Sequence, residues 1–453
     1  MKQDDFLRWF NRDFWKAFRR LSIPLDIPQT KEERRLLLVR VFEAIQSARY
    51  APGIPQVEIV SNKGLGVARY VPVFCIEDYC VYYFCIKELE DVLCSNRVSN
   101  TFGGWRLGGQ LPKAEHEEVS GDDPIYGRYS FNPDAWKQAF GQFNSLLFSQ
   151  LAEGRHSHVL QFDLSNFYDS VRLDILERWI REEALPEKGW IIALLFYLLN
   201  QWNRRNTGLH PQAVGLPMDA LADCSRILSN YYLQRYDRYA ERVCSEFGSA
   251  YFRYADDQMI LLHRREDVET LLLLLTRRLD RFGLRVNQKK TMVWTAEELR
   301  KHRFIELQAL FATKEDRRNP QIVRQFVERF LSISAAELAS SWNGGTPLLN
   351  RMLFTNLEAL PSDLFGLIVE RLTTDEYLLT TDFEKLIRVA RLCAVGNWAE
   401  FFGQRLEALC RSSVHNSFHY EVLAYAKETK NEALISSTMA RIAELNALMN
   451  RDE

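Results

Sequence analysis

The segment from Ala250 to Leu262 constrains the fold of this chain more than any other part of it. It reads as an apolar strand, then Asp256 and Asp257, then a second apolar strand. Two apolar strands with a tight polar connection form a β-hairpin. The fold must therefore place Asp256 and Asp257 together at the tip of a hairpin whose flanking strands are buried. Taken alone, an Asp-Asp pair is usually only a polar turn.

A third acidic residue ends another predicted strand. Residues 158–164, His-Val-Leu-Gln-Phe-Asp-Leu, alternate as a strand does and place Asp163 near its end. A strand end and a hairpin tip on one sheet can bring three carboxylates together. Magnesium prefers such hard oxygen ligands, and phosphoryl transfer with two metal ions needs carboxylates from separate segments. Adjacent aspartates raise each other's pKa, and a bound cation would relieve their repulsion.

These residues predict a metal site for nucleotidyl transfer. Its ligands would be Asp163, Asp256 and Asp257, holding two Mg²⁺ ions that Mn²⁺ could replace. The chain has 453 residues, of which 47% are apolar and 26% charged, as in globular proteins rather than disordered ones. Its formal net charge of −2 is mild evidence against a nucleic-acid binder, although polymerases bind through a local channel.

Cysteine spacing and hydropathy argue against a zinc-binding, a secreted or a membrane-spanning protein. None of the eight cysteines stands in a Cys-x-x-Cys pair, which argues against a zinc site. No secretory signal is evident, and no apolar run approaches the length of a membrane span. We therefore expect a reduced, cytoplasmic protein with no membrane association.

The remaining patterns predict the order of the elements. Met1–Leu21 reads as one amphipathic helix with a phenylalanine at every fourth position, and docking on the chain's own core is favoured over membrane or nucleic-acid contact. Two strands are expected within 54–75, a long loop or insertion at 101–134, and a strand near 284–294. Helices are expected at 76–95, 133–152, 171–183, 188–203, 217–246 and 266–282, and in most of the chain from about 320 onward.

Four segments in order carry a family resemblance. Residues 161–170, Gln-Phe-Asp-Leu-Ser-Asn-Phe-Tyr-Asp-Ser, resemble motif A of reverse transcriptases, and residues 252–257, Phe-Arg-Tyr-Ala-Asp-Asp, resemble their motif C. Between them, Gly215-Leu216-Pro217 and the later Ser225–Asn230 resemble motif B. Residues 283–291, Gly-Leu-Arg-Val-Asn-Gln-Lys-Lys-Thr, resemble motif D. The resemblance covers roughly residues 55–300.

The resemblance implies an α+β right-hand polymerase fold, with fingers, an antiparallel palm sheet with helices, and an all-α C-terminal region. The domains would be an N-terminal helical extension at 1–50, fingers at 51–157 with an inserted loop at 101–134, a palm at 158–312 carrying the four motifs, and a helical thumb-like domain at 313–453.

The resemblance also implies roles for single residues. Asp163, Asp256 and Asp257 would be the metal ligands, and Lys290, with Lys289 as its neighbouring rival, would protonate the pyrophosphate leaving group. Tyr168 would lie under the incoming sugar and exclude a ribose 2′-hydroxyl. The remaining nucleotide-binding residues would be Leu164, Gly215, Leu216, Pro217, Lys63 and Arg69. Lys63 and Arg69 would grip the triphosphate, but they fit solvated charges on a hairpin equally well.

Motif B differs from the common reverse transcriptase pattern, and the differences suggest which group of reverse transcriptases the chain resembles. Met218-Asp219 follow Pro217 where many members have Gln-Gly, and Ser225-Arg226 looks closer to bacterial defence-associated and abortive-infection reverse transcriptases. The implied function is an RNA-directed DNA polymerase in anti-phage defence that makes DNA from dNTPs on a partner non-coding RNA. The C-terminal helices could also form a homo-oligomer. Two alternatives stay open, namely a template-independent or protein-primed DNA polymerase and an RNA-binding scaffold without catalysis.

Overall fold

The chain divides into two compact units in a computed structural model. The model describes all residues except 20–24, 56, 63–67, 109, 115–134, 204–214, 219–222, 312–314, 341–345, 354–359, 361, 374–382, 396–397 and 450–453. The first unit comprises Met1–Leu21, Leu25–Glu58 and Val71–Ala296. The second comprises Ser22–Pro24, Ile59–Tyr70 and Glu297–Glu453. Among the described helices, none combines the length and apolar character that a membrane crossing requires.

The first unit begins with three helices, α1 (Gln3–Leu7), α2 (Arg12–Arg19) and α3 (Lys31–Gln46). The single helix predicted for Met1–Leu21 is therefore two helices. The break lies at Asn11, whose side chain accepts a hydrogen bond from the Phe14 amide and so caps α2. The predicted docking on the chain's own core is confirmed, because Phe6, Phe10, Phe14 and Phe18 are all buried there.

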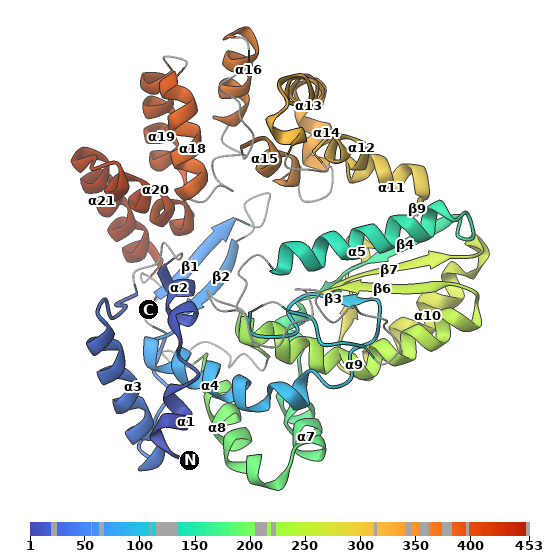
Figure 1. The fold of residues 1–453 in the computed structure, drawn as a ribbon, viewed down its shortest axis with the longest axis vertical. Helices are drawn as coiled ribbons and strands as arrows, with labels where there is room; N and C mark the ends of the chain where they lie inside the picture. Colours follow the sequence, from blue (N-terminus) through green and yellow to red (C-terminus); the bar gives the residue numbers. More distant parts are fainter. Residues whose placement is uncertain are drawn as a thin grey trace. The chain divides into compact units, whose positions relative to one another are not determined.

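A five-stranded sheet forms the centre of the first unit (Figure 1). The predicted hairpin is confirmed as β6 (Ala250–Tyr254) and β7 (Asp257–Leu262), with Tyr254 opposite Asp257. Beyond β7 lie β4 (His158–Phe162) and then β9 (Met292–Thr295), each antiparallel to its neighbour. On the other side of the hairpin, β3 (Thr101–Phe102) pairs with β6.

Two predictions for this sheet were wrong. The sheet is mixed rather than antiparallel, because β3 runs parallel to β6 within a stretch predicted to be loop. The strand predicted near 284–294 is two strands, β8 (Arg285–Val286) and β9, separated by the short 3₁₀ helix η3 (Gln288–Lys290). β8 pairs not with the large sheet but with β5 (Leu164–Ser165), which directly follows β4 in sequence. Most of the predicted insertion at 101–134 lies outside the described residues.

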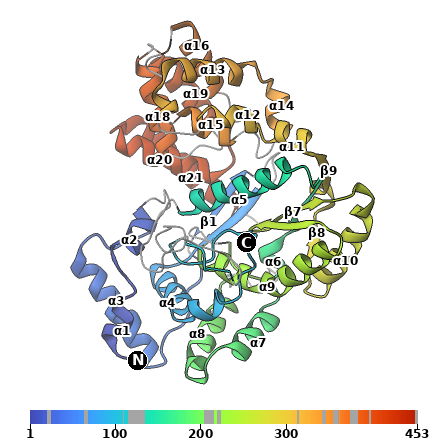
Figure 2. The same ribbon diagram turned by 45° about the vertical axis from the view of Figure 1, so that its right-hand side comes forward.

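Helices cover both faces of the sheet. Side chains of β6 alternate between them, since Tyr251 bonds Asp237 of α9 (Asp223–Glu246) on one face and Phe252 packs on Phe143 of α5 (Ala135–Ala152) on the other. The remaining helices of the unit are α4 (Ile76–Leu93), α6 (Phe167–Ser170), α7 (Leu173–Glu183), α8 (Gly189–Leu199) and α10 (Val268–Asp280). In both ribbon views α7 and α8 lie side by side below α4, and these helices contact one another (Figure 2).

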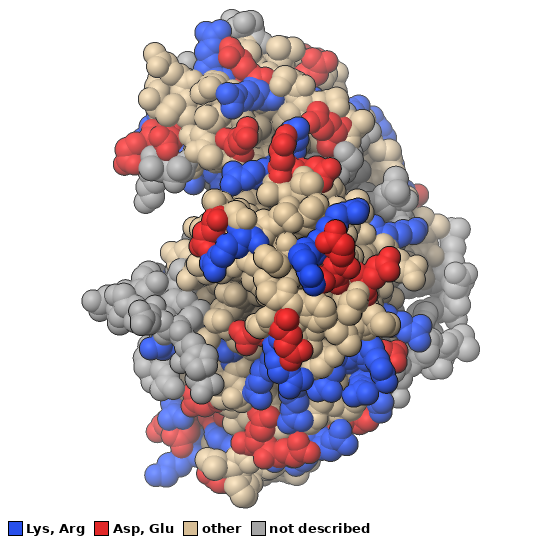
Figure 3. All heavy atoms as spheres, turned by 90° about the vertical axis from the view of Figure 1, so that its right-hand side faces the viewer, with Lys and Arg blue, Asp and Glu red and all other residues tan. Residues whose placement is uncertain are grey.

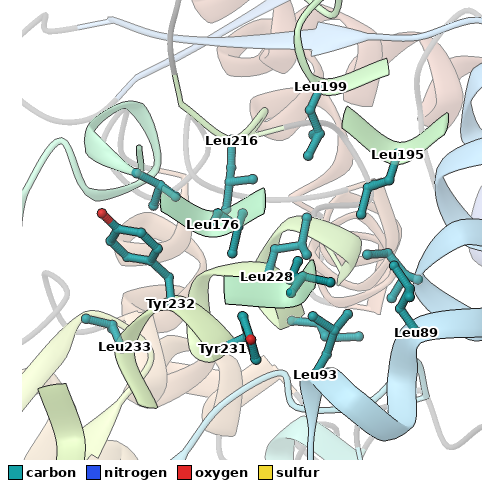
Figure 4. Close-up of a cluster of buried hydrophobic side chains, with 14 of the residues drawn as sticks. Leu89, Leu93, Leu176, Leu195, Leu199, Leu216, Leu228, Tyr231, Tyr232 and Leu233 are labelled. Atoms are coloured by element: carbon teal, nitrogen blue, oxygen red, sulfur yellow. The ribbon is translucent and has the colours of Figure 1, made fainter. Parts of the chain in front are cut away.

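One part of the first unit's hydrophobic core lies where α4, α7, α8 and α9 meet. Figure 4 shows side chains of this part, including Leu89, Leu93, Leu176, Leu195, Leu199, Leu228 and Tyr232. Leu216 reaches the same cluster from the loop before α9 and is fully buried. This core therefore fixes one end of the loop that was predicted to bind nucleotide.

The second unit is helical apart from the hairpin strands that it shares with the first, β1 (Val57–Asn62) and β2 (Ala68–Val73). Asn319 and Pro320 begin one of its helices as an N-cap and first-turn proline. The Val60 amide in β1 donates to the Asn416 side chain at 2.7 Å. The described helices are α11 (Ala296–His302), α12 (Ile305–Ala309), α13 (Pro320–Ser332), α14 (Ala335–Ser340), α15 (Thr346–Leu353), α16 (Ser362–Leu372), α18 (Phe383–Val395), α19 (Ala399–Ser412), α20 (Asn416–Glu428) and α21 (Glu432–Met449).

Candidate active site

The hairpin tip and the end of β4 bring Asp163 and Asp256 together. Phe162 pairs with Gln258 in the sheet, so the chain leaves β4 at Asp163 beside the tip. The carboxyl groups of Asp163 and Asp257 lie near enough to Asp256 to act on its ionisation. Burial, the charge of Asp257 and the charge of Asp163 together raise the pKa of Asp256 to about 7. Three acids thus share one small region, as their positions in the sequence predicted.

A buried arginine in β6 contacts the backbone of the hairpin tip. The Arg253 guanidinium is fully buried and binds both carboxylate oxygens of Asp237, at 2.8 and 2.6 Å. It also donates to the Asn230 side chain and to the carbonyl of Ala255, each at 2.7 Å. Ala255 has a left-handed φ of 53°, which is uncommon for a residue other than glycine. The contact from Arg253 therefore helps to hold the residue that immediately precedes Asp256.

Sequence reasoning missed the role of this arginine. Arg253 is a charged residue within a strand of otherwise apolar and aromatic residues, and this placement alone suggests that its guanidinium is buried. A buried guanidinium requires a buried acid. The acid could have been sought on the helix that follows motif B, but no local pattern singles out Asp237.

Lys290 also lies in this region. Its ammonium Nζ is 2.7 Å from Asp163 Oδ2. Backbone pairing brings it there, because Leu164 pairs with Val286 and the Asn287 amide donates to the Asp163 carbonyl at 2.7 Å. Burial alone would lower the pKa of Lys290, but the hydrogen bond to Asp163 and the surrounding carboxylates outweigh it and raise that pKa. Of the two adjacent lysines, Lys290 is the one that reaches Asp163.

The loop Gly215–Pro217 packs on the backbone of Tyr168. The Leu216 amide donates to the Tyr168 carbonyl at 2.9 Å, and Trp202 Nε1 donates to the Gly215 carbonyl at 3.0 Å. A Cβ atom added to Gly215 would lie 2.1 Å from the Tyr168 carbonyl oxygen and 2.6 Å from Asp169 Cα. Only glycine fits there without displacing one of the two segments. The structure thus joins the two segments that were predicted to surround the nucleotide.

Two predicted triphosphate-binding residues are not joined to this region by the structure. Lys63 lies outside the described residues, and Arg69 lies in the part of β2 that belongs to the second unit. Their predicted role stays a prediction.

The residues present suit a hard divalent cation. Within the described parts of the chain, no three His, Cys, Asp or Glu side chains are already arranged around a common metal position. Asp163 is bound by the Lys290 ammonium, and burial together with the neighbouring carboxylates raises the pKa of Asp256. Close carboxylates repel one another, and a bound cation would relieve that repulsion. Oxygen donors alone are what Mg²⁺ and Mn²⁺ prefer.

Replacing Gly215 by alanine should disrupt the site. The added methyl cannot coexist with the Tyr168 carbonyl, so either the loop or Tyr168 must move by an ångström or more. A shift of that size near reacting groups costs about a hundredfold in rate, measurable as primer extension by the purified variant. Gly141→Ala is the matched control, because a Cβ there meets nothing within 4 Å in α5. The prediction would be wrong if the two variants extended primers equally well.

Asp256 should give the protein a distinctive pH dependence of stability. Its pKa is about 7 when folded, against an ordinary value of 3.8. The folded chain therefore holds this proton more tightly, and the stabilisation is complete at low pH and is lost as pH rises through the folded pKa. In EDTA, we expect the Tm of the unmodified chain to fall relative to that of Asp256→Asn as pH rises from about 5 to about 8. Parallel Tm curves for the two proteins would contradict this assignment.

Comparison with known proteins agrees with this geometry. Residues 132–322 match the family model for reverse transcriptase (RNA-dependent DNA polymerase). Asp163, Asp256, Asp257, the Gly215–Pro217 loop and Lys290 all fall within this range. Among curated proteins, none matches the chain significantly. The chain thus carries a reverse transcriptase domain over residues 132–322 and is an RNA-directed DNA polymerase, a nucleotidyltransferase.

Proposed function

We propose that Asp163, Asp256 and Asp257 hold two divalent cations, normally Mg²⁺, and that the chain uses them to make DNA from dNTPs on an RNA template. The observation that carries this proposal is the convergence of three carboxyl groups, in which Asp163 and Asp257 lie close enough to Asp256 to raise its pKa and Lys290 lies 2.7 Å from Asp163. When bound, such ions lower the pKa of an attacking hydroxyl and neutralise charge on the transferring phosphate.

The chain's own residues would supply the remaining chemistry. Lys290 keeps its proton because its pKa is raised, and we infer that its Nζ donates that proton to the departing pyrophosphate. We infer that the Tyr168 ring lies against the incoming sugar and leaves no room for a 2′-hydroxyl. Leu164, Gly215, Leu216 and Pro217 would form the wall of the nucleotide site, and Lys63 and Arg69 would bind its triphosphate.

A basic surface supports a nucleic-acid partner despite the net charge of −2. Arg277, Arg281 and Arg285 are exposed at the end of α10 and in β8. On the face of the molecule that carries α10, lysine and arginine side chains gather over the lower part (Figure 3). Clustered positive side chains bind the phosphate backbone of nucleic acids. These basic side chains, which acidic ones accompany on the same face, are consistent with a nucleic-acid partner.

We further propose that the biological role is anti-phage defence in a bacterium, with a partner non-coding RNA as template. Support comes from motif B, where Met218 stands in place of glutamine and Ser225-Arg226 resembles the defence-associated group. The helices that follow the four motifs are also consistent with that group.

Primer extension with the purified chain and any co-purifying RNA tests the polymerase proposal. Labelled dNTPs or NTPs are supplied with Mg²⁺, with Mn²⁺ or with EDTA. We expect incorporation of dNTPs that needs a divalent ion, and sequencing of the product should show a copy of the RNA. A product linked covalently to the protein would select the protein-primed alternative. RNA binding without incorporation under any condition would select the scaffold alternative.

Plaque assays test the defence proposal separately. Bacteria that express the chain together with its flanking non-coding sequence should reduce plating of at least some phages, and Asp256→Asn should abolish that reduction. An active polymerase that protects against no phage in a broad panel would refute the defence role and leave the polymerase activity intact.

A further inference from the structure

A chain of hydrogen bonds fixes the far end of the Gly215–Pro217 loop. Ser225, in the first turn of α9, is fully buried, and its Oγ is 2.5 Å from the Pro217 carbonyl oxygen. The same Oγ is 2.9 Å from the hydroxyl of Tyr82 on α4. A carbonyl can only accept, so the single Ser225 proton goes to Pro217 and Tyr82 must donate to Ser225. The bonds therefore run in one direction, from Tyr82 through Ser225 to Pro217.

Each residue of the loop is held by a different partner. Trp202 binds the Gly215 carbonyl, Tyr168 accepts from the Leu216 amide, and Ser225 binds the Pro217 carbonyl. The Leu216 side chain is fully buried in the helical core (Figure 4). With three consecutive residues fixed in this way, the loop cannot shift as a unit without breaking at least one buried hydrogen bond.

The loop in turn fixes Tyr168. Gly215 lies so close to the backbone of Tyr168 and Asp169 that no Cβ fits between them, and Leu216 donates to the Tyr168 carbonyl. The backbone of Tyr168 therefore contacts the loop directly. A movement of Pro217 would displace Leu216 and Gly215, and these two residues contact Tyr168. The short helix α6 that carries Tyr168 begins at Phe167, directly after Asn166, whose φ of 45° is left-handed.

We propose that Ser225, aligned by Tyr82, is a positioning residue that sets how strictly the enzyme selects deoxynucleotides. The two hydroxyls touch neither substrate nor reacting atoms in this scheme; they act by holding the loop and thereby Tyr168. This inference rests on the proposed role of Tyr168 in sugar selection. Buried hydroxyls from two helices, Tyr82 of α4 and Ser225 of α9, give polar support to the Pro217 end of the loop.

The test compares single-nucleotide incorporation of a dNTP and of the NTP with the same base, giving kcat and KM for each. Ser225→Ala and Tyr82→Phe remove the two hydroxyls and little else. We expect each to raise the KM for dNTP and to reduce the dNTP-over-NTP preference by about tenfold, which corresponds to one lost buried hydrogen bond. The double variant should resemble Ser225→Ala alone, since both hydroxyls act in one chain.

Ser229→Ala is the matched control. Ser229 lies one turn further along α9, is also buried, and its hydroxyl donates to the Arg226 carbonyl of its own helix. It should leave the sugar preference unchanged. Thermal melting of each variant identifies any variant that is unfolded at the assay temperature. If Ser225→Ala is unfolded there, Tyr82→Phe alone tests the proposal, with the same expected changes in KM and sugar preference.

Tyr168→Ala separates failure of this inference from failure of the proposed function. If Tyr168→Ala admits NTPs but Ser225→Ala and Tyr82→Phe keep the original preference and KM, the inference about the two hydroxyls is overturned and the role of Tyr168 stands. If Tyr168→Ala itself leaves the preference unchanged, the proposed role of Tyr168 is wrong, and the inference falls with it.

Discussion

Substitution of Asp256 by asparagine should reduce primer extension by at least about a thousandfold, because a metal-assisted phosphoryl transfer draws several kcal/mol from its carboxylate-held ions. Asparagine has nearly the same shape as aspartate but offers one neutral oxygen in place of a charged pair. Asp256 lies beside Asp163 and Asp257, so its replacement removes one of the three proposed carboxylate ligands. The measurement is single-turnover incorporation of one dNTP at saturating Mg²⁺.

The matched control is Asp174→Asn. Asp174 is an exposed carboxylate at the start of α7, where it pairs with Arg172 at the surface. Its loss should leave the rate within twofold or so, as surface ion pairs contribute little. If Asp256→Asn retained more than a tenth of the original rate while folding normally, the carboxylate group could not be the centre of the chemistry, and the metal-ligand assignments would have to be withdrawn.

Local pattern was enough to place the acids of the site. The alternation around Asp256 and Asp257 predicted a hairpin, and the alternation that ends at Asp163 predicted a strand beside it, because both depend on neighbours within a few residues. The choice between Lys289 and Lys290 was not accessible in this way. It depends on the register of β5 against β8, which links segments more than a hundred residues apart.

The misjudged parts of the fold have similar causes. A strand of two residues such as β3 carries no readable period, and its parallel pairing with β6 joins positions that are about 150 residues apart. The first helix was read as continuous because its phenylalanines keep a regular spacing, while the break comes from one capping side chain, Asn11. The spacing of apolar residues along the sequence indicates which face of a segment is buried, but it does not indicate where one helix ends and the next begins.

Replacement of Arg253 by methionine is expected to lower the free energy of unfolding by about 3–5 kcal/mol, because it leaves the Asp237 carboxylate buried without its partner. Both side chains are fully buried, and in the described part of the chain the Tyr251 hydroxyl would be the remaining side-chain donor to Asp237. For a unit of this size the loss corresponds to a fall in Tm of about 10 °C, measurable by calorimetry. Arg172→Met is the control, since Arg172 makes the same two-pronged contact with Asp174 in solvent and should cost under about 1 kcal/mol.

The paired variant Arg253→Met with Asp237→Leu separates stability from function. Removing both charges abolishes the unpaired buried carboxylate, so most of the lost stability should return. Activity should not return, because the Ala255 carbonyl still lacks its donor and the left-handed residue before Asp256 is no longer held. Recovery of both would mean that Arg253 serves the core alone; recovery of stability without activity would mean that the ion pair also orients the tip carrying Asp256 and Asp257. A loss below about 1 kcal/mol in the single variant would refute the buried pair itself, since a stranded charge at zero exposure cannot cost so little.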